Sequence, residues 1–378
     1  KEKEMKFEDY FDAIDLDSEG GNLSDLRYVP SDTADLDETN LVIFSVPESR
    51  YGDNTGEINL HGIISALSNL NIHGQKLKKV AVLGSLKVGK SLHDTEAAVS
   101  QIVEEVLSKR VTPLILSSSR EITYGVYQAF KSLEEVVNVA SIDWKLNVES
   151  TQEAGFVGKI IKEQPNFLFN YSCLGYQTYH VSPEELSLAD ELYFDVLRLG
   201  ELRGDIYKAE PIIRGSEVIS VSMEALKASD YESSQNPQPN GFYAEEICQC
   251  VRYAGLSEKL KVLLITDINL LDKSSDQLLI AEMIWCLLDG LYARFSEIPN
   301  ARNSQYLKYR VAIKDDEFQL VFYKSLKTDR WWMEVPVPPQ YSNKYRKQHL
   351  IPCDYDDYKT ATNDDLPDRW WKAYKKLL

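Results

Sequence analysis

Three polar side chains follow one apolar run of the sequence at a spacing that could bring them together. Asp143, Lys145 and Asn147 come directly after the apolar run 136–142. Residues i, i+2 and i+4 of a β-strand share one face, so a strand through them would present all three at its carboxyl end. The aspartate and the asparagine offer oxygen ligands to a metal ion, whereas the lysine opposes one. A metal site would belong at the carboxyl end of such a strand, and the lysine is the one residue of the three that would oppose it.

Three further segments contribute to a family resemblance. They are Leu116-Ser-Ser-Ser-Arg120-Glu121-Ile122-Thr123-Tyr124-Gly125, Glu217-Val-Ile-Ser-Val-Ser222-Met-Glu224 and Pro239-Asn-Gly-Phe-Tyr-Ala-Glu-Glu246. With 143–147 they resemble, in order, four segments of the ureohydrolases (arginase, agmatinase, formimidoylglutamase): Gly-Gly-x-His-Glu-Ile-x-Tyr-Gly, Asp-x-His-x-Asp, Ser-x-Asp-x-Asp and Pro-Gly-Gly. A divergent formimidoylglutamase-like branch is most similar, and it shares Gly175-Tyr-Gln177, Leu199-Gly-Glu-Leu-Arg203, Glu210-Pro-Ile-Ile-Arg214 and a Trp-Trp tail.

The resemblance implies a site with two manganese ions, whose bridging hydroxide attacks a guanidinium or formimino carbon. The family's six ligand positions are occupied here by Arg120, Asp143, Lys145, Asn147, Ser222 and Glu224. One aspartate is retained and one glutamate could still coordinate, while cations stand where the family has histidines. Because these cations would repel a metal ion, we expect no metal and no catalytic residues.

Two arrangements of these degenerate positions stay open. In the first, Asp143 and Glu224 balance Arg120 and Lys145, so that a cluster of salt bridges replaces the two ions. In the second, the same side chains turn to solvent at the strand ends, where ion pairs contribute little.

A substrate pocket could also be retained without the metals. Its candidate residues are Glu121, Asp230 and Asn240, and the loop 231–240 would cover it. Such a pocket could hold a guanidino or carboxylate ligand. Glu121 has a second explanation, because a carboxylate at the start of a helix stabilises that helix.

A competing motif is Gly84-Ser-Leu-Lys-Val-Gly89-Lys90-Ser91, which matches the phosphate-binding P-loop. It follows an apolar run at 79–83 and precedes a helical pattern, as such a loop requires. Asp267, at the end of another apolar run, would then help to hold magnesium. Residues 83–95 also resemble a formimidoylglutamase segment, so nucleotide binding is kept as an alternative at Gly84, Gly89, Lys90 and Ser91.

The elements that position these residues follow from hydrophobic periodicity. Apolar, β-branched runs predict strands at 41–46, 79–83, 111–116, 136–142, 166–171, 217–222 and 261–266. Helical periodicity occurs at 93–109, 122–135, 243–254 and 276–294. Such alternation predicts a three-layer αβα fold with a mainly parallel sheet, whose ligands gather at the carboxyl ends of the strands.

After about residue 304 the alternation stops. Hairpin strands are predicted at 306–313 and 318–325, and Asp-Arg-Trp-Trp occurs at 329–332 and again at 368–371. We expect the tryptophans to anchor this extension against the main body. The predicted organisation is an N-terminal segment 1–40, an arginase-like domain 41–303 and a C-terminal extension 304–378.

Composition limits the partners. The net charge of -17 over 378 residues opposes binding to nucleic acid or an anionic membrane. No apolar run is long enough to span a bilayer and no leader is visible, so a cytoplasmic protein is expected. The five cysteines lack the spacing of a zinc site and are expected to be buried, reduced thiols. A protein partner, a small guanidino or carboxylate ligand and a homo-oligomer all fit.

The sequence thus indicates a formimidoylglutamase-like protein with a binding or scaffolding role and without a functional metal site. Two alternatives are an active hydrolase of formimino or guanidino C–N bonds, which would use one metal or another base, and a P-loop nucleotide-binding protein.

Overall fold

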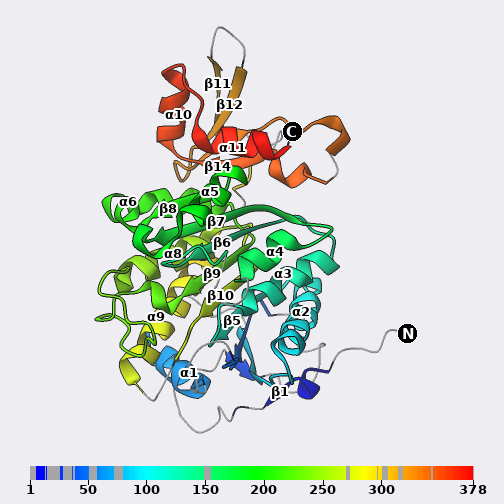
Figure 1. The fold of residues 1–378 in the computed structure, drawn as a ribbon, viewed down its shortest axis with the longest axis vertical. Helices are drawn as coiled ribbons and strands as arrows, with labels where there is room; N and C mark the ends of the chain where they lie inside the picture. Colours follow the sequence, from blue (N-terminus) through cyan, green and yellow to red (C-terminus); the bar gives the residue numbers. More distant parts are fainter. Residues whose placement is uncertain are drawn as a thin grey trace.

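The computed structural model describes residues 6–12, 14, 26–28, 36, 39–50, 58–71, 80–148, 155–269, 273–295, 297–299, 305–313, 318–341 and 344–377. Within these residues an α/β body carries a smaller C-terminal unit at one end (Figure 1). None of the helices in these ranges has the length and apolarity needed to cross a membrane.

The body is built on one sheet, to which the described residues contribute ten strands in the order β1-β4-β3-β5-β10-β9-β6-β7-β8, with β2 also paired to β4. All pairs are parallel except β1 with β4. The strands are β1 (Phe11–Asp12), β2 (Leu26–Tyr28), β3 (Leu41–Val46), β4 (Val80–Leu86), β5 (Thr112–Ser117), β6 (Val137–Ile142), β7 (Leu168–Tyr176), β8 (Asp195–Arg198), β9 (Val218–Ser222) and β10 (Val262–Thr266).

Helices cover both faces of this sheet. One apolar core lies under α1 (Leu60–Ser68), α6 (Leu199–Gly204), α7 (Ala209–Arg214), α8 (Ala244–Leu256) and α9 (Ser274–Tyr292). A second core lies under α2 (Leu92–Ser108), α3 (Ile122–Ser132), α4 (Phe156–Lys162) and α5 (Pro183–Glu191). The predicted three-layer αβα fold is confirmed.

The central strands form where the sequence is continuously apolar because both of their faces are covered. Every residue of β3, β5, β6, β9 and β10 is buried. Each fully buried side chain of the size of Ile43, Leu114 or Ile265 contributes about 1.5–3 kcal/mol, so these strands form the rigid part of the body.

The start of α2 is fixed by local chemistry. Ser91 caps the helix by accepting a hydrogen bond from the Asp94 amide, and Asp94 accepts one from the Ser91 amide in return. This capping box satisfies two backbone donors that a helix start otherwise leaves without partners.

The predicted N-terminal segment 1–40 contains two short strands of the main sheet. Both of them, β1 and β2, pair with β4. The described part of the N-terminal segment is therefore an edge of the main sheet.

The C-terminal unit has its own antiparallel sheet and core. Its strands β11 (Tyr306–Ile313), β12 (Phe318–Ser325), β13 (Trp331–Glu334) and β14 (Leu350–Cys353) pair in chain order, and α10 (Tyr355–Thr362) and α11 (Asp368–Leu377) pack on them. The hairpin strands occur where we predicted them. Trp331 and Trp370 are buried in this core, Trp332 packs on Arg214 of the body, and Trp371 is half-buried.

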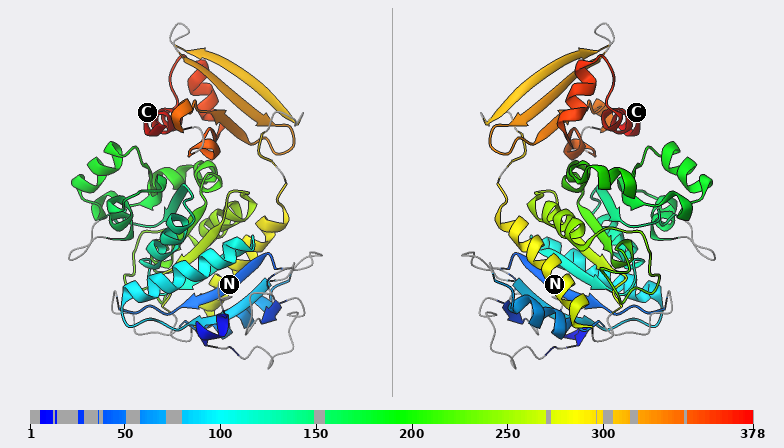
Figure 2. Two further views of the ribbon diagram at one scale, coloured as in Figure 1. Left: turned by 90° about the vertical axis from the view of Figure 1, so that its right-hand side faces the viewer. Right: turned by 90° about the vertical axis from the view of Figure 1, so that its left-hand side faces the viewer.

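This unit contacts the body near the amino ends of the strands. Arg214, at the end of α7, donates hydrogen bonds from Nη2 to the Trp331 and Cys353 carbonyls over 3.1 and 3.3 Å. Asn138, near the start of β6, donates from Nδ2 to Gln348 Oε1 over 3.1 Å. Figure 2 shows the unit stacked on one end of the body. The carboxyl ends of β6 and β9 are thus at the far ends of these strands from the junction.

All five cysteines have free thiols. Cys173, Cys250 and Cys353 are buried, whereas Cys248 and Cys286 are half-buried. The expectation of burial holds for three of the five.

Candidate functional site

Four adjacent strands of the sheet each lead into a charged residue. In the order β5, β10, β9 and β6, these residues are Arg120, Asp267, Glu224 and Asp143. Because parallel strands place their carboxyl ends at one edge, the four side chains meet there. We call these four residues the ion cluster.

Arg120 lies at the centre of the ion cluster and is only 7% exposed. Its Nη1 donates to both carboxylate oxygens of Asp143, over 2.9 and 2.8 Å, and its Nη2 donates to Glu224 Oε2. Its Nε donates to Asp267 Oδ1 over 3.1 Å. One planar guanidinium thus serves three carboxylates, a geometry that the fixed fork of donors in arginine allows.

Neighbouring polar groups hold the carboxylates of Asp143 and Asp267 in place. Asn147 Nδ2 and the Trp144 amide donate to Asp143 over 2.8 and 2.7 Å. Ser222 Oγ donates to Asp267 Oδ2 over 2.6 Å. Asp267 and Asn147 adopt φ values of 57° and 58°, a left-handed conformation that aspartate and asparagine tolerate better than most residues.

The loop 231–240 contacts the ion cluster. Asn236 Nδ2 donates to Glu224 Oε1 over 2.6 Å, so both carboxylate oxygens of Glu224 have partners. Tyr231, at the start of the loop, is buried, and its hydroxyl accepts a hydrogen bond from the Asn269 amide over 2.7 Å. The loop is therefore tied down over the carboxyl ends of the strands.

The ion cluster has more negative than positive charge. Burial alone would lower the pKa of Arg120, but Asp143, Asp267 and Glu224 outweigh it and raise that pKa. Burial raises the pKa of Glu224; Arg120 opposes this rise and Asp267 adds to it. Burial among three carboxylates that share one guanidinium thus disfavours the charged form of Glu224.

These residues do not fit a pair of metal ions. A guanidinium lies between the three carboxylates, and its hydrogen bonds use the oxygens that would face a metal. In the parts of the chain that the structure describes, no group of three or more His, Cys, Asp or Glu side chains could hold a metal ion.

Five of the six sequence-predicted positions belong to this network, and Lys145 does not. We predicted that a strand continues through Asn147, but β6 ends at Ile142 and the chain bends at 144–145. The two-residue alternation that would have aligned Lys145 with Asp143 is therefore lost. Its Nζ lies 5.2 Å from the centre of the Trp144 ring, and no carboxylate of a described residue lies within 4 Å of it.

Asp267 is the member of the ion cluster that sequence reasoning missed. We had considered it only as a magnesium partner of a P-loop. The pattern that could have identified it is its place directly after the buried run Val262–Thr266, at the same sheet edge as the other positions.

The three predicted pocket residues have separate roles. Glu121 lies 3.3 Å from Lys159 Nζ, and burial raises its pKa. Asp230 accepts a hydrogen bond from the Ala244 amide at the start of α8 over 2.9 Å, and the Asn240 carbonyl accepts one from Gln177. No hydrogen bond or ion pair joins any two of the three among the described residues.

The glycine-rich segment does not form a phosphate cradle. Strand β4 continues through Gly84 to Leu86, and two amides of the segment already have partners within the chain. The Gly89 amide donates to Thr95 Oγ1 over 3.0 Å, and the Ser91 amide donates to Asp94 over 2.9 Å. Lys90 is exposed.

Neither a protein-family model nor a curated protein matches this sequence. Solved structures do match. Formimidoylglutamase from Bacillus subtilis aligns with a TM-score of 0.60 at 16% identity, covering 78% of this chain and 94% of its own. The chain has the ureohydrolase fold.

Two other structures with the ureohydrolase fold support this assignment. Trypanosoma cruzi formiminoglutamase with Mn²⁺ aligns with a TM-score of 0.59 at 14% identity, covering 78% of this chain and all of its own. Agmatine ureohydrolase from Thermoplasma volcanium aligns with a TM-score of 0.55 at 17% identity, covering 67% of this chain and 90% of its own. The comparison thus fixes the fold, while Arg120 and Glu224 of the ion cluster differ from the ligands that the family resemblance implies at their positions.

Proposed function

We propose that this chain is a non-catalytic, formimidoylglutamase-like protein with the ureohydrolase fold, in which the ion cluster replaces the binuclear metal centre. The role left to it is binding, either of a protein partner or of a small guanidino or carboxylate ligand. One observation carries the proposal: the Arg120 guanidinium donates to Asp143, Glu224 and Asp267 at the carboxyl ends of four adjacent strands.

The chemistry of the site supports this proposal. Metal-assisted hydrolysis needs a cation that lowers the pKa of a bound water. A guanidinium has no open coordination position, and all three carboxylates are engaged with it. No histidine is hydrogen-bonded to the ion cluster in the described structure: His180, which follows β7, has its ring centre 4.6 Å from that of Trp144 and its Nε2 3.1 Å from Gln238 Oε1.

The burial of the carboxylates also supports the proposed non-catalytic role. Asp143 is 2% exposed and Glu224 is 6% exposed, and Asn236 of the loop 231–240 caps the outer oxygen of Glu224. A substrate would have to displace this hydrogen bond and compete with Arg120 for the same carboxylates.

The test combines metal analysis with an activity assay on the full chain. The protein is loaded with manganese, dialysed and analysed for bound metal, then assayed for release of urea or formamide from guanidino and formimino substrates. We expect no stoichiometric manganese and no turnover. An active manganese ureohydrolase, treated in parallel, is the positive control. Stoichiometric metal accompanied by turnover would overturn the proposal and favour the active hydrolase.

A further inference from the structure

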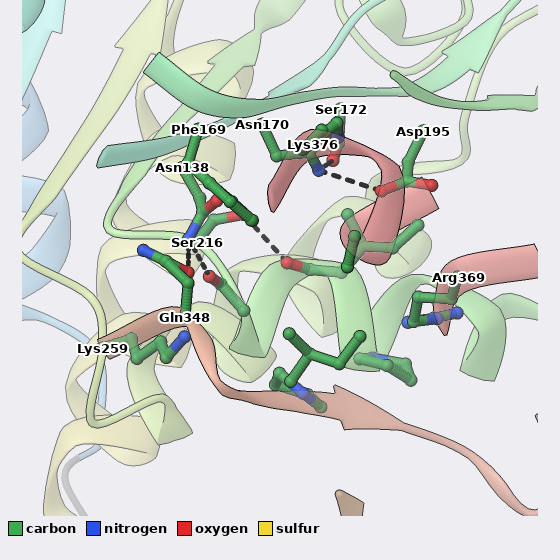
Figure 3. Close-up of a pocket in the computed structure, with 16 residues that line it drawn as sticks. Asn138, Phe169, Asn170, Ser172, Asp195, Ser216, Lys259, Gln348, Arg369 and Lys376 are labelled. Atoms are coloured by element: carbon green, nitrogen blue, oxygen red, sulfur yellow. Dashed lines mark hydrogen bonds between the residues drawn. The ribbon is translucent and has the colours of Figure 1, made fainter. Parts of the chain in front are cut away.

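A cavity of about 60 Å³ lies between the body and the C-terminal unit, near the amino ends of the strands and therefore away from the ion cluster (Figure 3). Its walls include the start of β6, the start of β7 and the residues before β9 from the body, together with α11 and the segment before β14. A single buried water needs a cavity of about 10–15 Å³, so this cavity has room for a small polyatomic ion.

Two ammonium groups line the cavity from different units. Lys259 comes from the segment before β10 and Lys376 from α11, and Figure 3 shows them on different sides of the space. Lys376 Nζ donates to Asn170 Oδ1. Both side chains are half-buried, and for neither lysine does a carboxylate of the described residues form an ion pair within 4 Å of Nζ.

The acidic groups nearest to these lysines have other partners. Glu217 Oε2 accepts hydrogen bonds from the Asn138 amide and Asn138 Nδ2 over 2.8 and 3.0 Å. Asp195 accepts one from Asn170 over 2.9 Å and lies 3.5 Å from Lys372 Nζ. The positive charge of the cavity wall is thus only partly balanced.

A hydrogen-bond donor without a partner lines the same cavity. Gln348 is 2% exposed, and its Oε1 accepts from Asn138, as Figure 3 shows. Its Nε2 has no hydrogen-bond partner among the described residues. A buried amide donor without a hydrogen-bond acceptor lowers stability by about 1–3 kcal/mol unless a ligand or a water accepts its hydrogen bond.

We propose that this cavity binds a small oxyanion, a phosphate or a carboxylate group, which Lys259, Lys376 and Gln348 hold between the two units. An oxyanion supplies the acceptors and the negative charge that this wall lacks, and charge-assisted hydrogen bonds to lysine are strong ones. The site is independent of the ion cluster, so the proposal stands or falls separately from the proposed function.

The protonation of the lysines agrees with this geometry. Burial lowers the pKa of Lys259, and it lowers the pKa of Lys376 to about 8. A bound anion would favour the charged form of both groups. It would also join the units, since Lys259 belongs to the body and Lys376 and Gln348 to the C-terminal unit.

Thermal unfolding of the full chain tests the proposal. Inorganic phosphate and acetate are each compared with chloride at equal ionic strength. We expect one of the oxyanions to raise the melting temperature in a saturable manner, and the two arms tell a phosphate site from a carboxylate site. If neither raises it above the chloride value, the proposal is wrong.

Two substitutions test the location of the site. Lys259→Met and Lys376→Met keep an apolar stem and remove the charge, so each should weaken the effective affinity for the oxyanion about tenfold or more. Lys375→Met is the matched control: Lys375 lies on α11 outside the cavity, 4.6 Å from the Trp371 ring centre, and its substitution should leave the affinity unchanged.

Calorimetric titration of each folded variant provides a second measurement, after circular dichroism has established that the variant is folded. Equal oxyanion affinity in the two cavity variants and in the control would place the binding elsewhere and overturn the proposal.

Discussion

A guanidinium can serve as the counter-charge for several carboxylates because its N–H donors point in fixed, separate directions. Arg120 uses this property toward Asp143, Glu224 and Asp267. A buried ion pair contributes little net stability compared with apolar packing, but the loss of one partner leaves the other buried and uncompensated. The stability of this region therefore depends strongly on one side chain.

We predict that Arg120→Met lowers the free energy of unfolding by about 3–5 kcal/mol at neutral pH, because three carboxylates then face one another without a cation. The loss should shrink as the pH falls, since burial raises the pKa of Glu224 and protonation of this carboxylate removes part of the repulsion. Urea denaturation at several pH values measures both effects.

The control for this variant is Arg198→Met. Arg198 pairs with Glu201 over 2.8 Å at the surface, where both side chains are well exposed. Its loss should cost less than about 1 kcal/mol. Similar losses in the two variants would show that the ion cluster does not bear on stability.

Lys376 lies near the amino ends of the strands, away from the ion cluster, and its pKa predicts how the stability of the protein depends on pH. Its pKa is lowered from 10.5 to about 8 by burial, so the folded state disfavours its charge. The buried charge lowers the free energy of unfolding fully below pH 8. This loss disappears as the pH rises toward 10.5, because between pH 8 and 10.5 the unfolded state binds more protons than the folded state.

We therefore predict that Lys376→Met stabilises the protein at pH 7 and that this gain shrinks between about pH 8 and 10.5. Denaturation in chloride buffers, without phosphate or carboxylates, measures the gain, and Lys375→Met controls for the loss of a lysine from the same helix. A gain that does not shrink over this interval would contradict the assigned cause.

The candidate site could be predicted from the sequence only in part. The positions of Arg120, Asp143, Asn147, Ser222 and Glu224 follow from the resemblance of their segments to the ligand segments of the ureohydrolases. Lys145 was misplaced, since alternation holds only while a strand continues and β6 ends at Ile142. Asp267 was missed because one aspartate after an apolar run does not reveal which strand lies beside it.

At the scale of elements, prediction succeeded where burial is continuous. Fully buried strands such as Leu41–Val46 and Val262–Thr266 were located to within a residue or two, since solvent-free strands are apolar throughout. The short elements from Phe156 to Arg214 were largely not predicted. Helices such as α6 and α7, of six residues each, have too few turns for a clear period.

Strand β7 contains a position that only glycine can occupy. Gly175 has φ +97°, and a Cβ there would lie 2.2 Å from Phe242 Cε2, next to the loop 231–240. We predict that Gly175→Ala lowers the free energy of unfolding by about 3 kcal/mol or more, through backbone strain and overlap. Denaturation midpoints measure this loss.

Gly200→Ala is the matched control for Gly175→Ala. Gly200 lies in α6, and a Cβ added there would have no neighbouring atom within 4 Å, so alanine should be neutral or stabilising by up to about 1 kcal/mol. If Gly175→Ala were as mild as this control, the close contact with Phe242 would not be real.

At the scale of the whole molecule, Arg214 connects the body to the C-terminal unit. Its Nε lies 2.8 Å from Glu210, its Nη2 donates to two carbonyls of the C-terminal unit, and its guanidinium lies 4.5 Å from the Trp332 ring centre. Because it is 6% exposed, these interactions are shielded from water.

We predict that Arg214→Met lowers the free energy of unfolding by about 3 kcal/mol and raises hydrogen exchange in the C-terminal unit more than in the body. Arg252→Met is the control, since Arg252 pairs with Asp289 with 44% of its side chain exposed and should cost less than about 1 kcal/mol. Equal changes in exchange over both units would argue against a local junction.

The guanidinium at the tips of the central strands also bears on how the protein matures. A cation that is part of the polypeptide arrives with translation and cannot dissociate. Under the proposed function, folding would need no metal-loading step, and neither a chelator nor a shortage of trace metals in the cell would remove the counter-charge from these carboxylates.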